Sequence, residues 1–308
     1  MDTDGPTVSL VLSSGGARGL VHIGAIQCLR DSGYRIRFVS GSSMGALVGG
    51  IYAAGRLDEY AQWVAELRRS DIVQLLDFGW GAAAGLFKGE RIIAVLEELV
   101  GHWQIEDLPV GFTAVATELN KKREVWISQG SLFSAVRASI GIPLVFAPVV
   151  RGDQILVDGG VLNPLPIAPA LSQNSDLIIA VDVNGLDEHR LQARLPLHKR
   201  HQQTEPEDVT IEEDGDSSIR QAVTGFMEDL FRSEEPDKID HGMWDIATES
   251  MDAMQVAISR LKLSMYTPDI LVQVPRNVAH FFEFDRGQEL IDMGYARMRA
   301  ALNPDMDQ

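Results

Sequence analysis

The order of apolar and polar residues along the chain predicts strands that alternate with helices. Short apolar runs, typical of buried strands, occur at 8–12, 36–39, 112–119, 124–128, 177–183 and 270–274. Between them, apolar residues recur at helical spacing at 20–29, 44–54, 57–67, 92–100, 131–139, 246–263 and 285–302. The run at 177–183 is almost entirely apolar, which is typical of a central parallel strand that is covered on both faces. The pattern therefore predicts an α/β fold.

Two polar turns separate pairs of short strands in the middle of the chain. The turn Asn120-Lys121-Lys122-Arg123 joins 112–119 to 124–128 in a predicted hairpin. Its basic tip is interpreted as a solvated turn. A second turn, Gly152-Asp153, lies between two further short strands.

Residues 184–240 differ in character from the rest of the chain. Basic and histidine residues are interleaved in the first part, and 205–216 carries seven acids and no base. Such a stretch has little apolar surface to bury, so we expect a charged, partly mobile insertion, and its histidines fit no compact set of metal ligands. Within it, an apolar stripe at helical spacing predicts an amphipathic helix at 218–232. The predicted organisation is a single domain, 1–308, that contains this insertion.

Composition narrows the classes of function. The chain has 308 residues, of which 45% are apolar, enough to bury a sizeable core, and its formal net charge is −17. This charge disfavours nucleic acid and anionic bilayers as partners, so lipid contact is expected to come from apolar surface and to be at most peripheral. Cys28 is the only cysteine, which excludes an intramolecular disulfide and a thiolate zinc cluster. No cofactor and no metal are predicted.

The sequence also bears on location. Residues 1–6 lack the basic head and the apolar stretch of a signal peptide, and no run reaches the roughly 18 apolar residues of a membrane span. We expect a soluble, cytoplasmic protein, and homo-oligomer formation is left open.

The chemistry of the chain centres on a serine between a strand and a helix. Ser43 is the middle residue of Gly41-Ser42-Ser43-Met44-Gly45, a Gly-x-Ser-x-Gly sequence at the junction of two predicted elements. A serine in such an elbow is held in a strained backbone that projects its hydroxyl above the sheet, and the next helix start favours a developing anion. The same residues also suit an ordinary strand-to-helix connection. The surrounding pattern favours a nucleophile.

A second glycine-rich turn follows the first predicted strand. Gly15-Gly16-Ala17-Arg18-Gly19 presents backbone N–H groups that can bind an anion. The loop lacks the Gly-Lys-Ser/Thr ending of a P-loop, and Ser14 stands where a dinucleotide fingerprint has its first glycine. An oxyanion hole uses the same N–H groups. Because consecutive parallel strands place their following loops side by side, the two turns together favour acyl transfer.

A third motif, Asp158-Gly159-Gly160, follows the second short strand of the middle region. A carboxylate at the end of a strand, next to glycines that admit a close neighbour, suits general-base catalysis. It suits a turn equally well. The apolar segment 141–148 just ahead of it is bounded by prolines and is too stiff for a helix, and it fits either the lining of an acyl pocket or a buried connection.

Together these residues resemble the patatin-like phospholipase family, in particular its small bacterial members. Three motifs carry the resemblance in the family's order: Gly15-Gly16-Ala17-Arg18-Gly19, Gly41-Ser42-Ser43-Met44-Gly45 and Asp158-Gly159-Gly160. The stretch Arg137-Ala138-Ser139-Ile140-Gly141-Ile142-Pro143 is also similar to the one that precedes the family's aspartate motif. The resemblance covers 8–182 and, more loosely, 243–302. Ser14 departs from it, because the family usually has a glycine there.

The resemblance implies a three-layer α/β/α fold with a mainly parallel central sheet. It also implies a Ser-Asp dyad, with Ser43 as the nucleophile and Asp158 as the base, and no need for a histidine or a cofactor. The loop from Gly15 to Gly19 would form the oxyanion hole. The remaining motif glycines would support the dyad: Gly41, Gly45, Gly159 and Gly160. The substrate would be a phospholipid, a lysophospholipid or another fatty-acyl ester, cleaved through an acyl-enzyme.

Three other hypotheses stay open at this point. One keeps the serine but adds a late histidine, such as His241 or His280, in a triad like that of α/β-hydrolases. Another is a non-catalytic or regulatory protein of this fold that binds a partner through the acidic insertion. The last is a nucleotide-binding module. The Asp-Gly-Gly sequence fits the dyad better than the triad.

Overall fold

The computed structural model describes residues 5–75, 85–185 and 243–303. The predicted insertion at 184–240, with its helix at 218–232, lies outside the described residues except for its first two positions. The organisation as one domain with such an insertion therefore stays a prediction.

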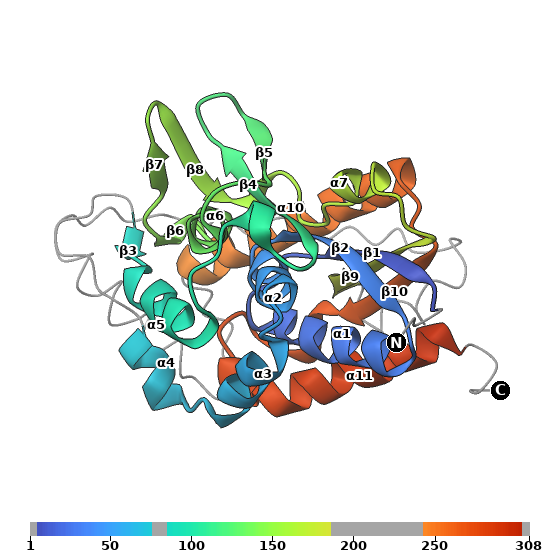
Figure 1. Ribbon diagram of the computed structural model, residues 1–308. Coiled ribbons are helices and arrows are strands. Elements are labelled where there is room, and N and C mark those ends of the chain that lie inside the picture. The colour runs from blue at the N-terminus through green and yellow to red at the C-terminus, as the bar shows by residue number, and fades with distance from the viewer. Residues whose placement is uncertain (1–4, 76–84, 186–242, 304–308) are drawn as a thin grey trace, which may run out of the picture.

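The centre of the fold is an eight-stranded sheet (Figure 1). Its strands are β1 (Thr7–Leu12), β2 (Arg35–Ser42), β4 (Gly111–Glu118), β5 (Arg123–Ile127), β7 (Val149–Arg151), β8 (Gln154–Asp158), β9 (Leu177–Gly185) and β10 (Ile270–Pro275). They lie in the order β10-β9-β1-β2-β4-β8-β7, and β5 pairs with β4. The first five strands in this order run parallel to one another: β10, β9, β1, β2 and β4. Strands β5, β7 and β8 are antiparallel to their neighbours. The predicted α/β class with a mainly parallel sheet is confirmed.

Helices cover both faces of this sheet. They are α1 (Val21–Asp31), α2 (Met44–Ala53), α3 (Leu57–Glu66), α4 (Arg69–Leu75), α5 (Glu90–Val100), α6 (Leu132–Ser139), α7 (Ala168–Leu171), α10 (Met243–Met265) and α11 (Gly287–Leu302). Figure 1 shows α1, α3 and α11 on one side of the sheet and α7 and α10 on the other. Within the described ranges, no helix combines the length and the apolar character of a membrane span.

Side chains of β1 show why three layers form. Leu10 and Leu12 enter the larger hydrophobic core, which also contains the apolar residues of α1 and α2. Val11 points to the opposite face, where it joins a smaller core with Ile167 and with Leu263 of α10. Because successive side chains of a strand point to opposite faces, a strand that carries apolar residues on both faces must be covered on both sides.

Two segments differ from the expectation. The proline-bounded segment 141–148 contains a short strand, β6 (Leu144–Phe146), which pairs with β3 (Gly85–Phe87) in a separate two-stranded sheet. The local pattern did not reveal this pair, because the two strands are far apart in the sequence. The glycine loop continues into a 3₁₀ helix, Gly16–Leu20, before α1 begins.

Strand register brings the three sequence motifs together. Leu12 of β1 pairs with Gly41 of β2, so the turns that follow these strands lie side by side. Strand β4 links the elbow to the aspartate, because its Val115 pairs with Ser42 and the next residue pairs with Asp158. The motifs therefore converge at the carboxyl ends of the parallel strands, the usual place for a site in an α/β sheet.

Candidate active site

Ser43 occupies a strained turn between β2 and α2. Its backbone has φ 53° and ψ −123°, a positive-φ conformation that residues with a side chain rarely adopt. A Cβ at Gly41 would lie 2.3 Å from the Gly45 carbonyl, and one at Gly45 would lie 2.2 Å from the Leu12 carbonyl oxygen. Both flanking positions of the Gly-x-Ser-x-Gly sequence are thus too tightly packed for a larger residue, and this packing holds Ser43 in its strained conformation.

The Ser43 hydroxyl is directed at a buried carboxylate. Ser43 Oγ donates a hydrogen bond of 2.6 Å to Asp158 Oδ2. Asp158 Oδ1 accepts the N–H of Gly160 at 2.7 Å, which fixes the orientation of the carboxylate. Only 3% of Ser43 and 2% of Asp158 are exposed. Gly159 packs against β4, where a Cβ would lie 2.0 Å from the Val115 carbonyl oxygen.

Burial changes the proton affinity of Asp158. Loss of hydration raises the pKa of its carboxyl group to about 7, while the hydrogen bonds from Ser43 and Gly160 oppose part of the rise. A carboxylate with a pKa near neutrality is a stronger base than an exposed aspartate, and it can also act as an acid once protonated. The pair can therefore take a proton from a hydroxyl and return it.

The glycine loop 15–19 lies beside the aspartate motif. A Cβ at Gly160 would lie 2.9 Å from Ser14 Oγ, which shows how closely the two segments approach. Gly16 has a φ of +55°, and a Cβ there would lie 2.6 Å from the Phe281 carbonyl oxygen. An alanine at Gly16 would disturb the packing of the loop whatever its effect on chemistry, so this exchange cannot isolate oxyanion binding.

The N–H groups of the loop are not equivalent. The N–H of Ala17 donates to the Phe281 carbonyl oxygen at 2.9 Å and is therefore already engaged. Within the described ranges, the N–H groups of Gly15 and Gly16 have no such backbone partner. These two groups are the candidates for stabilising an oxyanion.

The side chain of Arg18 and the close packing at Gly19 anchor the loop. The Arg18 guanidinium is buried, pairs with Asp252 of α10 at 3.3 Å and donates to Asn184 Oδ1 at 3.3 Å. A Cβ at Gly19 would lie 2.4 Å from the Cβ of Met44, so the loop packs directly on α2. Arg18 therefore ties the loop to α10 and to the end of β9.

Ser139 belongs to the site, although the sequence analysis assigned it no role. Its Oγ accepts the N–H of Ser43 at 2.9 Å and donates to the Val115 carbonyl oxygen at 2.6 Å. The side chain is fully buried at the end of α6. The only signal in the sequence was its place in the stretch 137–143 that resembles the family, since local pattern does not reveal which elements a helix end will meet.

Polar residues on β9 and α10 hold the glycine loop in place through hydrogen bonds. Asn184 Nδ2 donates to the Ser14 carbonyl oxygen at 2.8 Å, and Ser14 Oγ donates to Gln255 Oε1 at 3.0 Å. Ser14, at the position where a glycine was expected, thus has a partner for its hydroxyl. Asp182 accepts the N–H of Asn184, and burial raises the pKa of its carboxyl group. The signal in the sequence was the presence of Asp182 and Asn184, two polar residues at the end of the otherwise apolar run 177–183.

No described histidine bonds to the serine or to the carboxylate. His280 is exposed, and both oxygens of Asp158 have other partners. His22 is buried against a loop carbonyl, and burial lowers the pKa of its imidazole to about 4. His241 lies outside the described residues. Nor does the described part of the chain hold a group of three or more His, Cys, Asp or Glu side chains arranged for a metal ion.

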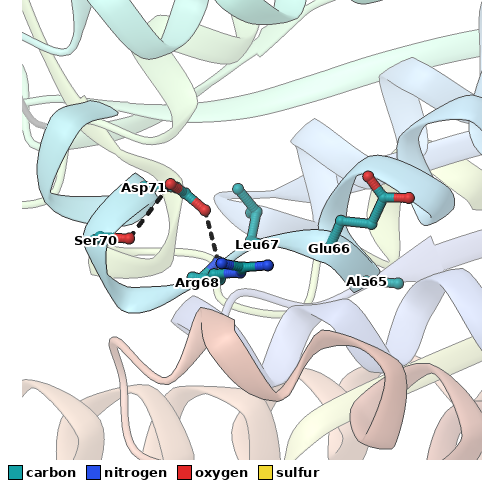
Figure 2. A pocket seen from close by; sticks show the side chains of 6 residues that line it. All are labelled: Ala65, Glu66, Leu67, Arg68, Ser70 and Asp71. Atoms are coloured by element: carbon teal, nitrogen blue, oxygen red, sulfur yellow. Dashed lines mark hydrogen bonds between the residues drawn. The ribbon is translucent and has the colours of Figure 1, made fainter.

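Two surface hollows lie away from these motifs. One of about 620 Å³ is formed where α3 leads into α4, as Figure 2 shows. One of its two carboxylates, Asp71, accepts the N–H of Arg68 at 3.0 Å and the Ser70 hydroxyl at 3.4 Å, and so stabilises the first turn of α4. The other, of about 390 Å³, is lined by residues that include parts of β2, β4, β5 and α7. Neither hollow is lined by Ser43 or Asp158.

Comparison with known proteins identifies a matching family model and several similar proteins. Residues 10–171 match the family model described as patatin-like phospholipase. An uncharacterized NTE family protein of Mycobacterium tuberculosis is 38% identical over an alignment 330 residues long, gaps included. The alignment covers 96% of this chain and 91% of that protein. A lysophospholipase of Yarrowia lipolytica is 31% identical over 192 residues, 60% of this chain but only 13% of that protein. Among solved structures, VipD from Legionella pneumophila aligns with 98% of this chain and 67% of its own, with a TM-score of 0.45 and 14% identity.

Proposed function

Because the chain belongs to the patatin-like phospholipase family, we propose that it hydrolyses fatty-acyl esters of phospholipids or lysophospholipids, with Ser43 as nucleophile and Asp158 as general base. The observation that carries the proposal is the 2.6 Å hydrogen bond from Ser43 Oγ to Asp158 Oδ2 in a buried site. The family is one of lipid ester hydrolases, and the relative from Yarrowia lipolytica is named a lysophospholipase. Both facts support the substrate class.

Acylation begins with a proton transfer. Asp158 Oδ2 takes the proton of the Ser43 hydroxyl while Oγ attacks the ester carbonyl carbon. The carbonyl oxygen gains negative charge and accepts hydrogen bonds from the N–H groups of Gly15 and Gly16, each worth about 10² to 10³ in rate. The ester C–O bond then breaks, and Asp158 returns the proton to the leaving alcohol oxygen.

Deacylation repeats these roles with water. Asp158 accepts a proton from a water molecule, whose oxygen attacks the acyl-enzyme carbonyl. The same N–H groups stabilise the second oxyanion. The bond to Ser43 Oγ breaks, Asp158 returns the proton to Oγ, and the fatty acid leaves. One water is consumed for each ester cleaved, and no histidine takes part.

Labelling with a fluorophosphonate probe tests the nucleophile and the base. Ser43→Ala should abolish both labelling and esterase turnover. Asp158→Asn keeps the shape of the side chain but removes the base, so single-turnover acylation should fall by about 10² to 10⁴. Ser42→Ala is the matched control, because Ser42 Oγ is buried beside the site and has no hydrogen-bond partner among the described residues. This control should keep full labelling.

Each alternative has its own outcome in this experiment. Labelling that survives in Ser43→Ala would assign the nucleophile to another serine. A folded wild-type protein without labelling or turnover would favour the non-catalytic protein that binds a partner. His280→Ala should leave activity unchanged, and a loss as large as that of Asp158→Asn would favour a histidine triad.

A further inference from the structure

Two turns that are distant in the sequence meet at one end of the sheet. The β4–β5 and β7–β8 hairpins project from the body of the protein, as Figure 1 shows at the top. Asn120 Nδ2 donates to the Asp153 carbonyl oxygen at 2.6 Å, and the N–H of Leu119 donates to a carbonyl oxygen of β8 at 2.9 Å. The two turns therefore form one surface. We call it the twin tip, and it consists of residues 118–123 and 150–154.

The twin tip concentrates positive charge on a strongly acidic chain. Its four basic side chains are all exposed: Lys121, Lys122, Arg123 and Arg151. Its acids are Glu118 and Asp153. The Glu118 carboxylate is buried and paired with Lys121 at 3.1 Å and with Arg123 at 2.8 Å. Four bases against two acids leave this surface positive, whereas the whole chain has a formal net charge of −17.

Two of the four cations are available to an external anion. Lys122 and Arg151 have no acidic partner among the described residues. Both are exposed, Lys122 in the β4–β5 turn and Arg151 as the last residue of β7. Each belongs to a different hairpin, so only the contact between the hairpins brings their charges to the same surface. This arrangement changes the interpretation of the basic turn, which by itself looked merely solvated.

Exposed aliphatic side chains accompany these cations. Val150, beside Arg151, is 68% exposed, and Leu119 is 44% exposed. Bases next to aliphatic side chains match the chemistry of an anionic bilayer surface. There the bases meet lipid phosphates, and the aliphatic groups enter the boundary between headgroups and acyl chains.

The acidic body is compatible with such a contact because the hairpins project from it. Interactions between exposed charges are largely screened beyond about 8 Å at physiological ionic strength. Acids on the far side of the molecule therefore contribute little at the membrane, while the charges of the twin tip act at contact distance. The uneven distribution also orients the protein with its tips toward an anionic surface.

We propose that the twin tip binds the protein to membrane surfaces that contain anionic phospholipid. Strand β8 leads from the tip at Gln154 to Asp158, a span of about 13 Å for four extended residues. A protein bound in this way keeps its candidate catalytic pair close to the surface that supplies lipid. The binding itself does not require that Ser43 be catalytic.

Co-sedimentation with vesicles tests the proposal, and the Ser43→Ala background keeps the vesicles intact. Vesicles of phosphatidylcholine alone are compared with vesicles in which about one third of the lipid is phosphatidylglycerol. We expect binding to the anionic vesicles only, and weaker binding as salt is raised. Lys122→Glu with Arg151→Glu should lower the partition coefficient at least about 30-fold, since each basic residue near an anionic leaflet contributes about a factor of five. Val150→Ser should lower it further.

A matched control distinguishes the effect of charge at the twin tip from the effect of net charge on vesicle binding. Arg37→Glu with Arg299→Glu makes the same change in net charge at exposed positions on β2 and α11, outside both hairpins, and should bind as the parent does. Lys122→Gln with Arg151→Gln repeats the test without new acids, and thermal melting checks that every variant is folded. Equal losses in the two Glu double variants, or no binding to anionic vesicles at low salt, would overturn the proposal.

Two further outcomes distinguish membrane binding from nucleic-acid binding and from the proposed hydrolase activity. If an oligonucleotide competes as well as the anionic vesicles, the twin tip is a nucleic-acid surface and the membrane assignment is wrong. Vesicle binding by the Ser43→Ala protein supports the twin tip even if probe labelling fails, so the two proposals can fail independently.

Discussion

At the residue scale, Asp158 sets the pH dependence of the proposed chemistry, because its carboxyl group must be ionised to accept the Ser43 proton. Burial raises the pKa of this group to about 7. The rate constant for fluorophosphonate labelling should therefore rise about tenfold per pH unit below pH 7 and level off above it. Labelling rates measured between about pH 5 and about pH 9 check this expectation. A midpoint near that of an exposed aspartate would mean that another group controls the reaction.

Ser139 is expected to act as a positioning residue for the nucleophile. In Ser139→Ala, the N–H of Ser43 and the Val115 carbonyl each lose a buried partner, which costs about 1–3 kcal/mol of stability per group. The strained turn loses its fixed geometry, so kcat should fall about tenfold or more while KM changes little. Ser139→Thr keeps a hydroxyl and should restore most of the rate.

The control for this prediction lies on the same helix. Ser134 is exposed on α6, and Ser134→Ala should change neither the melting temperature nor kcat. If Ser139→Ala lowers the melting temperature but labels at the wild-type rate, Ser139 only supports the fold.

At the scale of elements, α10 anchors the glycine loop across the carboxyl edge of the sheet. Arg18 of the loop pairs with Asp252, and Ser14 donates to Gln255, both on α10. The Arg18 side chain is 4% exposed and that of Asp252 is 26% exposed, so solvent weakens this pair only in part. The position of α10 is therefore coupled to that of Gly15 and Gly16, the candidate oxyanion donors.

Asp252→Ala should thus affect both stability and chemistry. It leaves the buried Arg18 charge without its ion-pair partner, and we expect the free energy of unfolding to fall by about 1–3 kcal/mol, discounted for partial exposure. Urea denaturation measures this loss, and the labelling rate should fall as well. Asp292→Ala on α11 removes an exposed acid and should stay within about 0.5 kcal/mol. Equal effects of the two changes would contradict the anchoring role.

At the scale of the whole molecule, the formal net charge of −17 makes self-repulsion a general destabilising force. Salt screens this repulsion, so the melting temperature at pH 8 should rise between about 0.02 M and about 0.5 M NaCl. The same salt should weaken vesicle binding through the twin tip, because that contact joins opposite charges. A melting temperature that falls with added salt would show that local attractive pairs outweigh the net repulsion.

Residue types and their spacing predicted much of the candidate site. The elbow around Ser43 and the glycine loop were assigned from strand, turn and helix signals that lie within a few residues of each other. Asp158 was ambiguous by itself, since its sequence also suits a turn, and the family resemblance supplied its role. The inequivalence of the loop N–H groups was not predictable, because the partner of Ala17 is the distant Phe281.

The sequence by itself determined the alternation of strands and helices, the central parallel strand at 177–183 and the places of the three motifs. It could do so because hydrophobic period and turn chemistry are properties of neighbouring residues. Only the tertiary structure decided that Ser139 meets the elbow, that α10 holds the glycine loop and that two hairpin tips merge into one positive surface. Those contacts depend on strand order, on register and on the packing of whole elements, and these arise from interactions between residues that no local pattern connects.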